Sequence, residues 1–83
     1  MMIYKVAMCL QIALPRLKRF DLKEYAATRP IIFVEAKDPD DACHKVVKTL
    51  VSLILSQDDS LEVKHMCKDI VNDVRIIKAQ VPV

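Results

Sequence analysis

The chain opens on an alternation of bulky apolar residues with smaller or polar ones. Between Ile3 and Leu14, one set of alternate positions is apolar and includes Tyr4, Val6, Met8, Leu10 and Ile12, and the other carries Lys5, Ala7, Cys9, Gln11 and Ala13. A period of two residues is typical of a β-strand. This pattern predicts a first strand over 3–14, which Pro15 ends because proline fixes φ and has no N–H to donate.

Two further strands are predicted. Residues Ile31 to Lys37 follow Pro30 and are rich in β-branched and aromatic side chains, and residues Val74 to Val81 return to strand character after a turn at Asn72-Asp73. Between the first two strands runs a polar, basic connection, 16–29. Its segment 21–27 contains good helix formers and predicts a turn or two of helix.

Two helices are predicted between the second and third strands. The sequence Asp38-Pro39-Asp40-Asp41 is typical of a helix start, and the helix should run to about Ser56. Asp59 or Ser60 could cap a second, shorter helix. Apolar stripes at helical spacing support both: Ala42, Cys43, Val46, Val47, Leu50, Val51, Ile54 and Leu55 in the first, and Val63, Met66, Cys67, Ile70 and Val71 in the second.

The predicted fold is a single α+β domain over residues 1–83, with a three-stranded sheet packed on one long and one short helix in the order β-loop-β-α-α-β. The sequence contains no glycine, which excludes the glycine-dependent phosphate loops, the nucleophile elbow and the EF-hand loop. Any left-handed closure of the first helix at Gln57, Asp58 and Asp59 must then come from an Asp or another tolerant residue.

Cysteine usage and hydropathy indicate a compartment. Three cysteines, an odd number without a Cys-x-x-Cys pair, argue against a secreted disulfide framework. No apolar stretch approaches the roughly 20 residues that a bilayer span requires. We therefore expect a cytoplasmic protein without a membrane segment.

Both faces of the predicted sheet carry apolar residues. If Ile32 faces the helices, Ile31 and Phe33 lie on the opposite face, and the last strand holds adjacent Ile76 and Ile77. Such a face needs covering. Either Leu17, Phe20, Leu22 and Tyr25 of the connection fold over it, or a second copy or another protein does.

The basic connection is the candidate contact segment. It has a net charge of +3, against −3 for residues 35–59. The candidate residues for contact with a protein partner or a nucleic acid are Arg16, Lys18, Arg19, Phe20, Lys23, Tyr25 and Arg29. Cations beside aromatic side chains could track a phosphate backbone and stack bases, so binding of single-stranded nucleic acid through residues 16–29 is the alternative function.

The residue types and their spacing do not favour a catalytic or metal-binding role. Cys43, His44, His65 and Cys67 are zinc-ligand types, but adjacent residues diverge on a helix, so we expect no metal site, although the sequence does not say whether the four meet in space. The carboxylates near Asp38 are explained by the helix start. We expect no enzyme and no cofactor.

The segment 17–25, Thr28-Arg29-Pro30 and the passage from Val34 through Asp41 to Ala42 resemble small uncharacterised proteins of tailed bacteriophages that infect cyanobacteria. The resemblance implies a viral accessory protein that acts in the host cytoplasm, and it supplies no binding residue. The leading hypothesis is a small non-enzymatic interaction module that self-associates as a homodimer and binds a host or viral protein through its apolar sheet face and basic connection.

Overall fold

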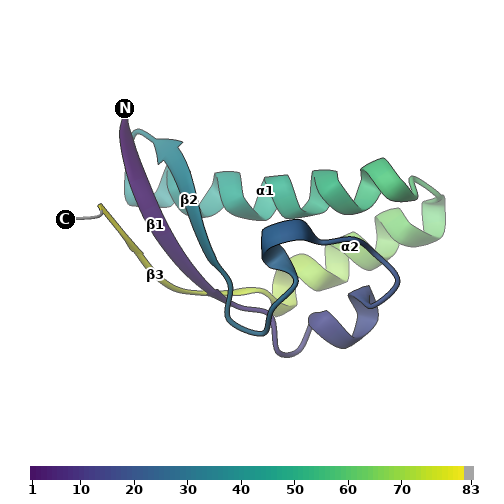
Figure 1. Cartoon of the computed structure of the whole chain (residues 1–83). Helices are drawn as coiled ribbons and strands as arrows, with labels where there is room; N and C mark the ends of the chain where they lie inside the picture. Colours follow the sequence, from purple (N-terminus) through teal and green to yellow (C-terminus); the bar gives the residue numbers. More distant parts are fainter. Residues whose placement is uncertain (82–83) are drawn as a thin grey trace.

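The computed structural model describes residues 1–81 and has the α+β architecture that the sequence predicts (Figure 1). Residues 82 and 83 of the predicted domain lie outside the described residues. The elements in chain order are β1 (Met2–Cys9), the 3-10 turns η1 (Leu14–Leu17) and η2 (Lys23–Tyr25), β2 (Ile31–Ala36), α1 (Pro39–Gln57), α2 (Leu61–Asp73) and β3 (Arg75–Gln80).

The three strands form one antiparallel sheet in the order β2-β1-β3. Lys5 of the central strand β1 pairs with Phe33 of β2 on one side and with Gln80 of β3 on the other. Between β1 and β3 the register shifts: Ala7 pairs with Lys78, but Met8 pairs with Ile76. Ile77 is therefore the extra residue of a β-bulge, in which two neighbouring residues of β3, Ile77 and Lys78, lie opposite Ala7 and share one side of the sheet.

One hydrophobic core lies between the sheet and the helices. The inward-facing residues of β1, namely Tyr4, Val6 and Met8, meet the stripe of α1 that repeats every four residues. The remaining core residues come from the connection, β2 and the two helices: Leu10, Ala13, Leu17, Phe20, Leu22, Tyr25, Ile32, Ala36, Ala42, Val46, Leu50, Ile54, Val63, Cys67 and Ile70.

The connection between β1 and β2 completes the core beyond the end of the sheet. The molecule measures 39 × 21 × 20 Å, and its helices extend well past the strands (Figure 1). The connection packs on this overhang: the Tyr25 hydroxyl donates to the Val46 carbonyl of α1 at 2.9 Å, and the Gln57 side chain exchanges hydrogen bonds with the Asp21 backbone. Leu17, Phe20, Leu22 and Tyr25 thus pack against the helices, and not over the outer sheet face, where the sequence also allowed them.

The predicted first strand is too long, because the alternation stops at Cys9. Leu10 is still buried, but a turn follows, and Ala13 is then buried while Ile12 is 54% exposed. A strand continued to Leu14 would have buried Ile12 and exposed Ala13. The prediction failed because large apolar residues continue at alternate positions as far as Leu14, although only part of them is buried, so the sequence pattern does not show where the strand ends.

Both helix starts agree with the prediction. The Asp38 carboxylate accepts from the Asp41 N–H at 2.7 Å, and Ser60, rather than Asp59, caps α2 by accepting from the Val63 N–H. Asn72 and Asp73 are helical rather than a turn, because α2 continues to Asp73 and passes directly into β3.

No left-handed residue closes α1. Asp58 follows it with extended backbone, and within residues 1–81 the sole positive φ belongs to Lys23, in the connection. The helix therefore ends at the predicted place, Gln57 and Asp58, and it ends without a left-handed residue. Among the described residues, neither helix combines the length and apolar character that crossing a bilayer requires.

Candidate protein-interaction surface

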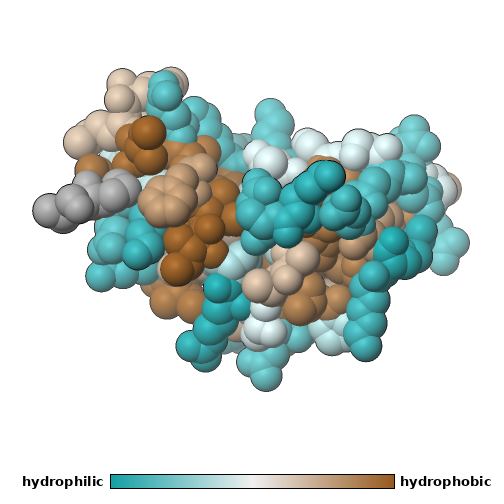
Figure 2. Space-filling view, viewed as in Figure 1, coloured by the Kyte–Doolittle hydropathy of each residue, from teal (hydrophilic) through white to brown (hydrophobic). Residues whose placement is uncertain are grey.

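The outer face of the sheet, the side turned away from the helices, is uncovered and apolar. Figure 2 shows hydrophobic side chains gathered over the strands on the face toward the viewer. Four large side chains form what we call the outer-face patch: Ile3 is 55% exposed, Ile31 49%, Phe33 61% and Ile77 57%. Isolated exposed apolar residues are common, but a contiguous group on one sheet face is typical of an interaction site.

Strand register explains why these side chains gather on one face. Ile3, Lys5 and Ala7 are alternate residues of β1 and lie opposite Glu35, Phe33 and Ile31 of β2, respectively. Side chains of directly paired residues share a face of the sheet. The bulge adds Ile77 to the same side, next to Lys78, which pairs with Ala7.

The patch reaches the free edge of the sheet at β2. The backbone N–H groups of Met8 and Leu10 donate to the carbonyls of Pro30 and Thr28, so even-numbered residues of β2 bond toward β1. The N–H and C=O groups of Ile31 and Phe33 then point to the edge. At the third residue of this set, the Glu35 carbonyl accepts from the Lys45 ammonium at 3.0 Å, which closes that end of the edge.

Charged side chains accompany the patch on the same face: Lys5 of β1, Glu35 of β2, and Arg75 and Lys78 of β3. The side chains of Lys5 and Glu35 lie on neighbouring strands, and they are diagonal neighbours because Glu35 pairs with Ile3, two residues before Lys5. Neither side chain belongs to an ion pair among the residues that the structure describes. A partner that covers the patch must accommodate both charges.

Three of the five cations in the predicted basic contact segment form ion pairs within the molecule. Arg16 pairs with Asp73 at the end of α2, and Arg19 pairs with Asp58 between the helices at 3.0 Å. Lys23 pairs with Asp21 at 3.1 Å. These cations therefore tie the connection to the helices or to itself.

The two aromatic candidates are core residues. Phe20 is 7% exposed and Tyr25 1%, and burial, followed by the nearby Glu24, raises the pKa of the Tyr25 phenol to about 12. The Arg19 guanidinium lies over the Phe20 ring, 4.3 Å from its centroid. Lys18 and Arg29 are the predicted contact residues that stay exposed and outside the ion pairs of the described chain.

The cysteines and histidines do not form a cluster. Cys67 is buried and Cys43 half-buried, and burial raises the pKa of both thiols, while His44 and His65 are exposed on different helices. Within residues 1–81, no group of three or more potential ligands could hold a metal ion.

Ile3 is the patch residue that sequence reasoning missed. The signal that could have identified it is its place in the alternation, where it falls on the same side as Lys5 and Ala7. In comparisons with protein-family models, curated proteins and solved structures, this chain matches none.

Proposed function

We propose that this chain is a small non-enzymatic protein-interaction module that self-associates through the outer-face patch. The observation that carries the proposal is that Ile3, Ile31, Phe33 and Ile77 stay exposed on one sheet face after the connection has been used to complete the core. Covering them removes apolar surface from water, which is the dominant favourable contribution to most protein association.

A second copy fits the charges of the patch. In a two-fold dimer each copy offers the same surface, so Lys5 of one copy can lie against Glu35 of the other. Lys5 and Glu35 then form ion pairs between the copies, while Arg75 and Lys78 lie on β3, at the side of the face away from Glu35. Small domains also commonly gain core volume by association.

The size of the face predicts a weak, reversible dimer. Three strands about 4.8 Å apart and about 20 Å long offer roughly 300 Å² of flat area. Stable complexes bury about 800 Å² per partner, and smaller contacts are typical of transient ones. We therefore expect a monomer–dimer equilibrium that depends on protein concentration.

The test is the molar mass by light scattering over a concentration series. We expect the mass to rise from 9.5 kDa toward twice this value at high micromolar concentration, and F33E to stay monomeric because a carboxylate would be buried in the interface. The control is L61E: Leu61 is 72% exposed, but it begins α2, outside the sheet. A wild-type chain that stays at 9.5 kDa throughout contradicts self-association.

Binding of a host or viral protein in the cytoplasm of a bacterial cell stays a prediction, supported by the same apolar patch. The nucleic-acid alternative gains less support from the geometry. Stacking needs exposed aromatic faces, but Phe20 and Tyr25 are buried, and Arg16, Arg19 and Lys23 are in ion pairs.

A further inference from the structure

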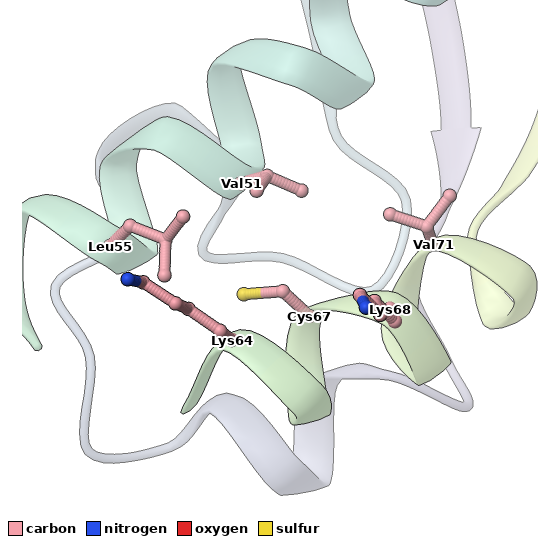
Figure 3. Close-up of a pocket in the computed structure, with 6 residues that line it drawn as sticks. All are labelled: Val51, Leu55, Lys64, Cys67, Lys68 and Val71. Atoms are coloured by element: carbon pink, nitrogen blue, oxygen red, sulfur yellow. The ribbon is translucent and has the colours of Figure 1, made fainter. Parts of the chain in front are cut away.

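A second apolar surface lies between the two helices. One hollow of about 320 Å³ is lined by Val51, Leu55, Lys64, Cys67, Lys68 and Val71 (Figure 3). A second, of about 480 Å³, is lined by His44, Val47, Lys48, Val51, Ser52 and Val71. Because the two share Val51 and Val71, they form one continuous surface, which we call the helix groove.

The floor of the helix groove is apolar. Val51 and Leu55 of α1 lie one residue after the fully buried Leu50 and Ile54, so they turn toward α2 and stay half-buried. Figure 3 shows the Cys67 sulfur directed into the space between the helices. Burial raises the pKa of this thiol, which keeps the floor uncharged at neutral pH.

The rim of the groove carries a single sign of charge. Lys48 of α1 and Lys64 and Lys68 of α2 line it, and no carboxylate belongs to either hollow. All three lysines are exposed, and none forms an ion pair among residues 1–81. In Figure 3 the Lys64 side chain extends toward Leu55, across the mouth of the groove. The overall net charge of +2 conceals this local concentration of cations.

The shape favours an extended ligand over a compact one. The lining of α1 runs from His44 to Leu55, which corresponds to about 17 Å of helix axis. An apolar groove of this length suits an amphipathic helix of about three turns, whose residues at i, i+3, i+4 and i+7 contact the floor. Lysines on both sides of the floor favour carboxylates on both flanks of such a helix.

We propose that the helix groove binds an acidic amphipathic helix of a partner protein, with its apolar face on Val51, Cys67 and Val71 and its carboxylates beside Lys48, Lys64 and Lys68. This surface lies on the helices, apart from the outer-face patch on the sheet. The inference therefore does not depend on self-association.

The probe is a fluorescein-labelled synthetic helix of about 14 residues with leucine at i, i+3, i+4 and i+7 and glutamate on both flanks. Its counterpart carries lysine on the flanks. Fluorescence anisotropy should show saturable binding of the acidic peptide that weakens with salt, and none of the basic peptide. Absence of saturable binding up to about 1 mM, or equal binding of both peptides, overturns the proposal.

Variants assign the binding to the groove. The double variant K64E/K68E should weaken binding by at least about tenfold, because two favourable charge contacts become repulsive. The control is K37E, since Lys37 is exposed between β2 and α1, away from the groove. Equal loss in the control and in the double variant overturns the assignment, and circular dichroism checks that both variants are folded.

A further variant separates this surface from the first one. F33E, which changes the sheet patch, should bind the acidic peptide as the wild type does. Loss of peptide binding in F33E places the peptide on the sheet and contradicts the groove. If the wild type is monomeric and still binds the peptide, self-association is contradicted and the groove proposal stands.

Discussion

Tyr25 shows how a residue that looks like a contact residue becomes a structural one. Its ring is 1% exposed and its hydroxyl donates to the Val46 carbonyl, so it fixes the connection to the middle of α1. A buried hydroxyl that lacks a partner is costly, and this hydrogen bond removes that cost. The residue therefore stabilises the fold and is not available to a ligand.

We expect Y25F to lower the free energy of unfolding by about 1 kcal/mol, since it deletes one buried hydrogen bond and leaves the ring in place. Urea denaturation measures the difference. Tyr4 provides the control, because it is also buried but its hydroxyl makes no hydrogen bond to a described residue. Equal effects of Y25F and Y4F would show that the bond to Val46 adds nothing.

The packing of Phe20 and Tyr25 against the helices could not be predicted from the sequence, which allowed them either to cover the outer sheet face or to contact a partner. They lie in a connection whose two 3-10 turns have four and three residues, too short for a periodic pattern to reveal a buried face. Tyr25 bonds to Val46 of α1, which lies 21 residues further along the chain. The charge of this segment could be read from the sequence, but the direction of its aromatic side chains could not.

At the scale of the elements, local chemistry made the helices predictable. Asp38 and Pro39 define the start of α1, and Ser60 defines the start of α2, because each signal acts within three residues of its own position. Strand ends were harder to predict. The bulge at Ile77 and the end of β1 at Cys9 depend on pairing with other strands, which no local signal specifies.

The cap of α1 gives a prediction at this scale. Removing the Asp38 carboxylate in D38A leaves the Asp41 N–H without its acceptor, and we expect a loss of about 1 kcal/mol in the free energy of unfolding. D40A is the control, because Asp40 is in the same first turn and makes no cap hydrogen bond. Thermal or urea denaturation that ranks the two variants equally would assign the effect to charge near the helix start instead of the cap.

At the scale of the whole molecule, opposite charges that are separated along the sequence form ion pairs with each other. The basic connection meets acidic positions at the helix ends, through Arg16 with Asp73 and Arg19 with Asp58. The two oppositely charged segments were evident from the sequence, but the basic connection was interpreted as a contact segment for another molecule. We propose that partners bind two exposed apolar surfaces instead. The outer-face patch combines strands that are far apart in the sequence, and the helix groove lies between the consecutive helices α1 and α2.

The ion pair between Asp58 and Arg19 makes the stability of the fold depend on acid pH. Its carboxylate accepts from the Ser60 N–H at 3.0 Å and from Arg19, and these hydrogen bonds hold the pKa of Asp58 below its ordinary value of 3.8. A folded-state pKa below the unfolded one means that the ionised carboxylate stabilises the folded chain at neutral pH. This stabilisation is lost as the pH falls below about 4 and through the folded-state pKa.

We therefore expect the free energy of unfolding of the wild type to fall as the pH drops from about 5 to about 3, and D58N to show a smaller fall over the same range. D58N should also be less stable than the wild type at neutral pH, because it replaces a charged acceptor by a neutral one. The neighbouring D59N is the control, since Asp59 is exposed and forms no ion pair in the described chain. Urea denaturation at several pH values measures how the free energy of unfolding of each variant depends on pH. If D58N shows the same dependence as the wild type, Asp58 does not contribute to it. Asp21 and Asp41, whose pKa values are also lowered, would then account for the loss of stability in acid.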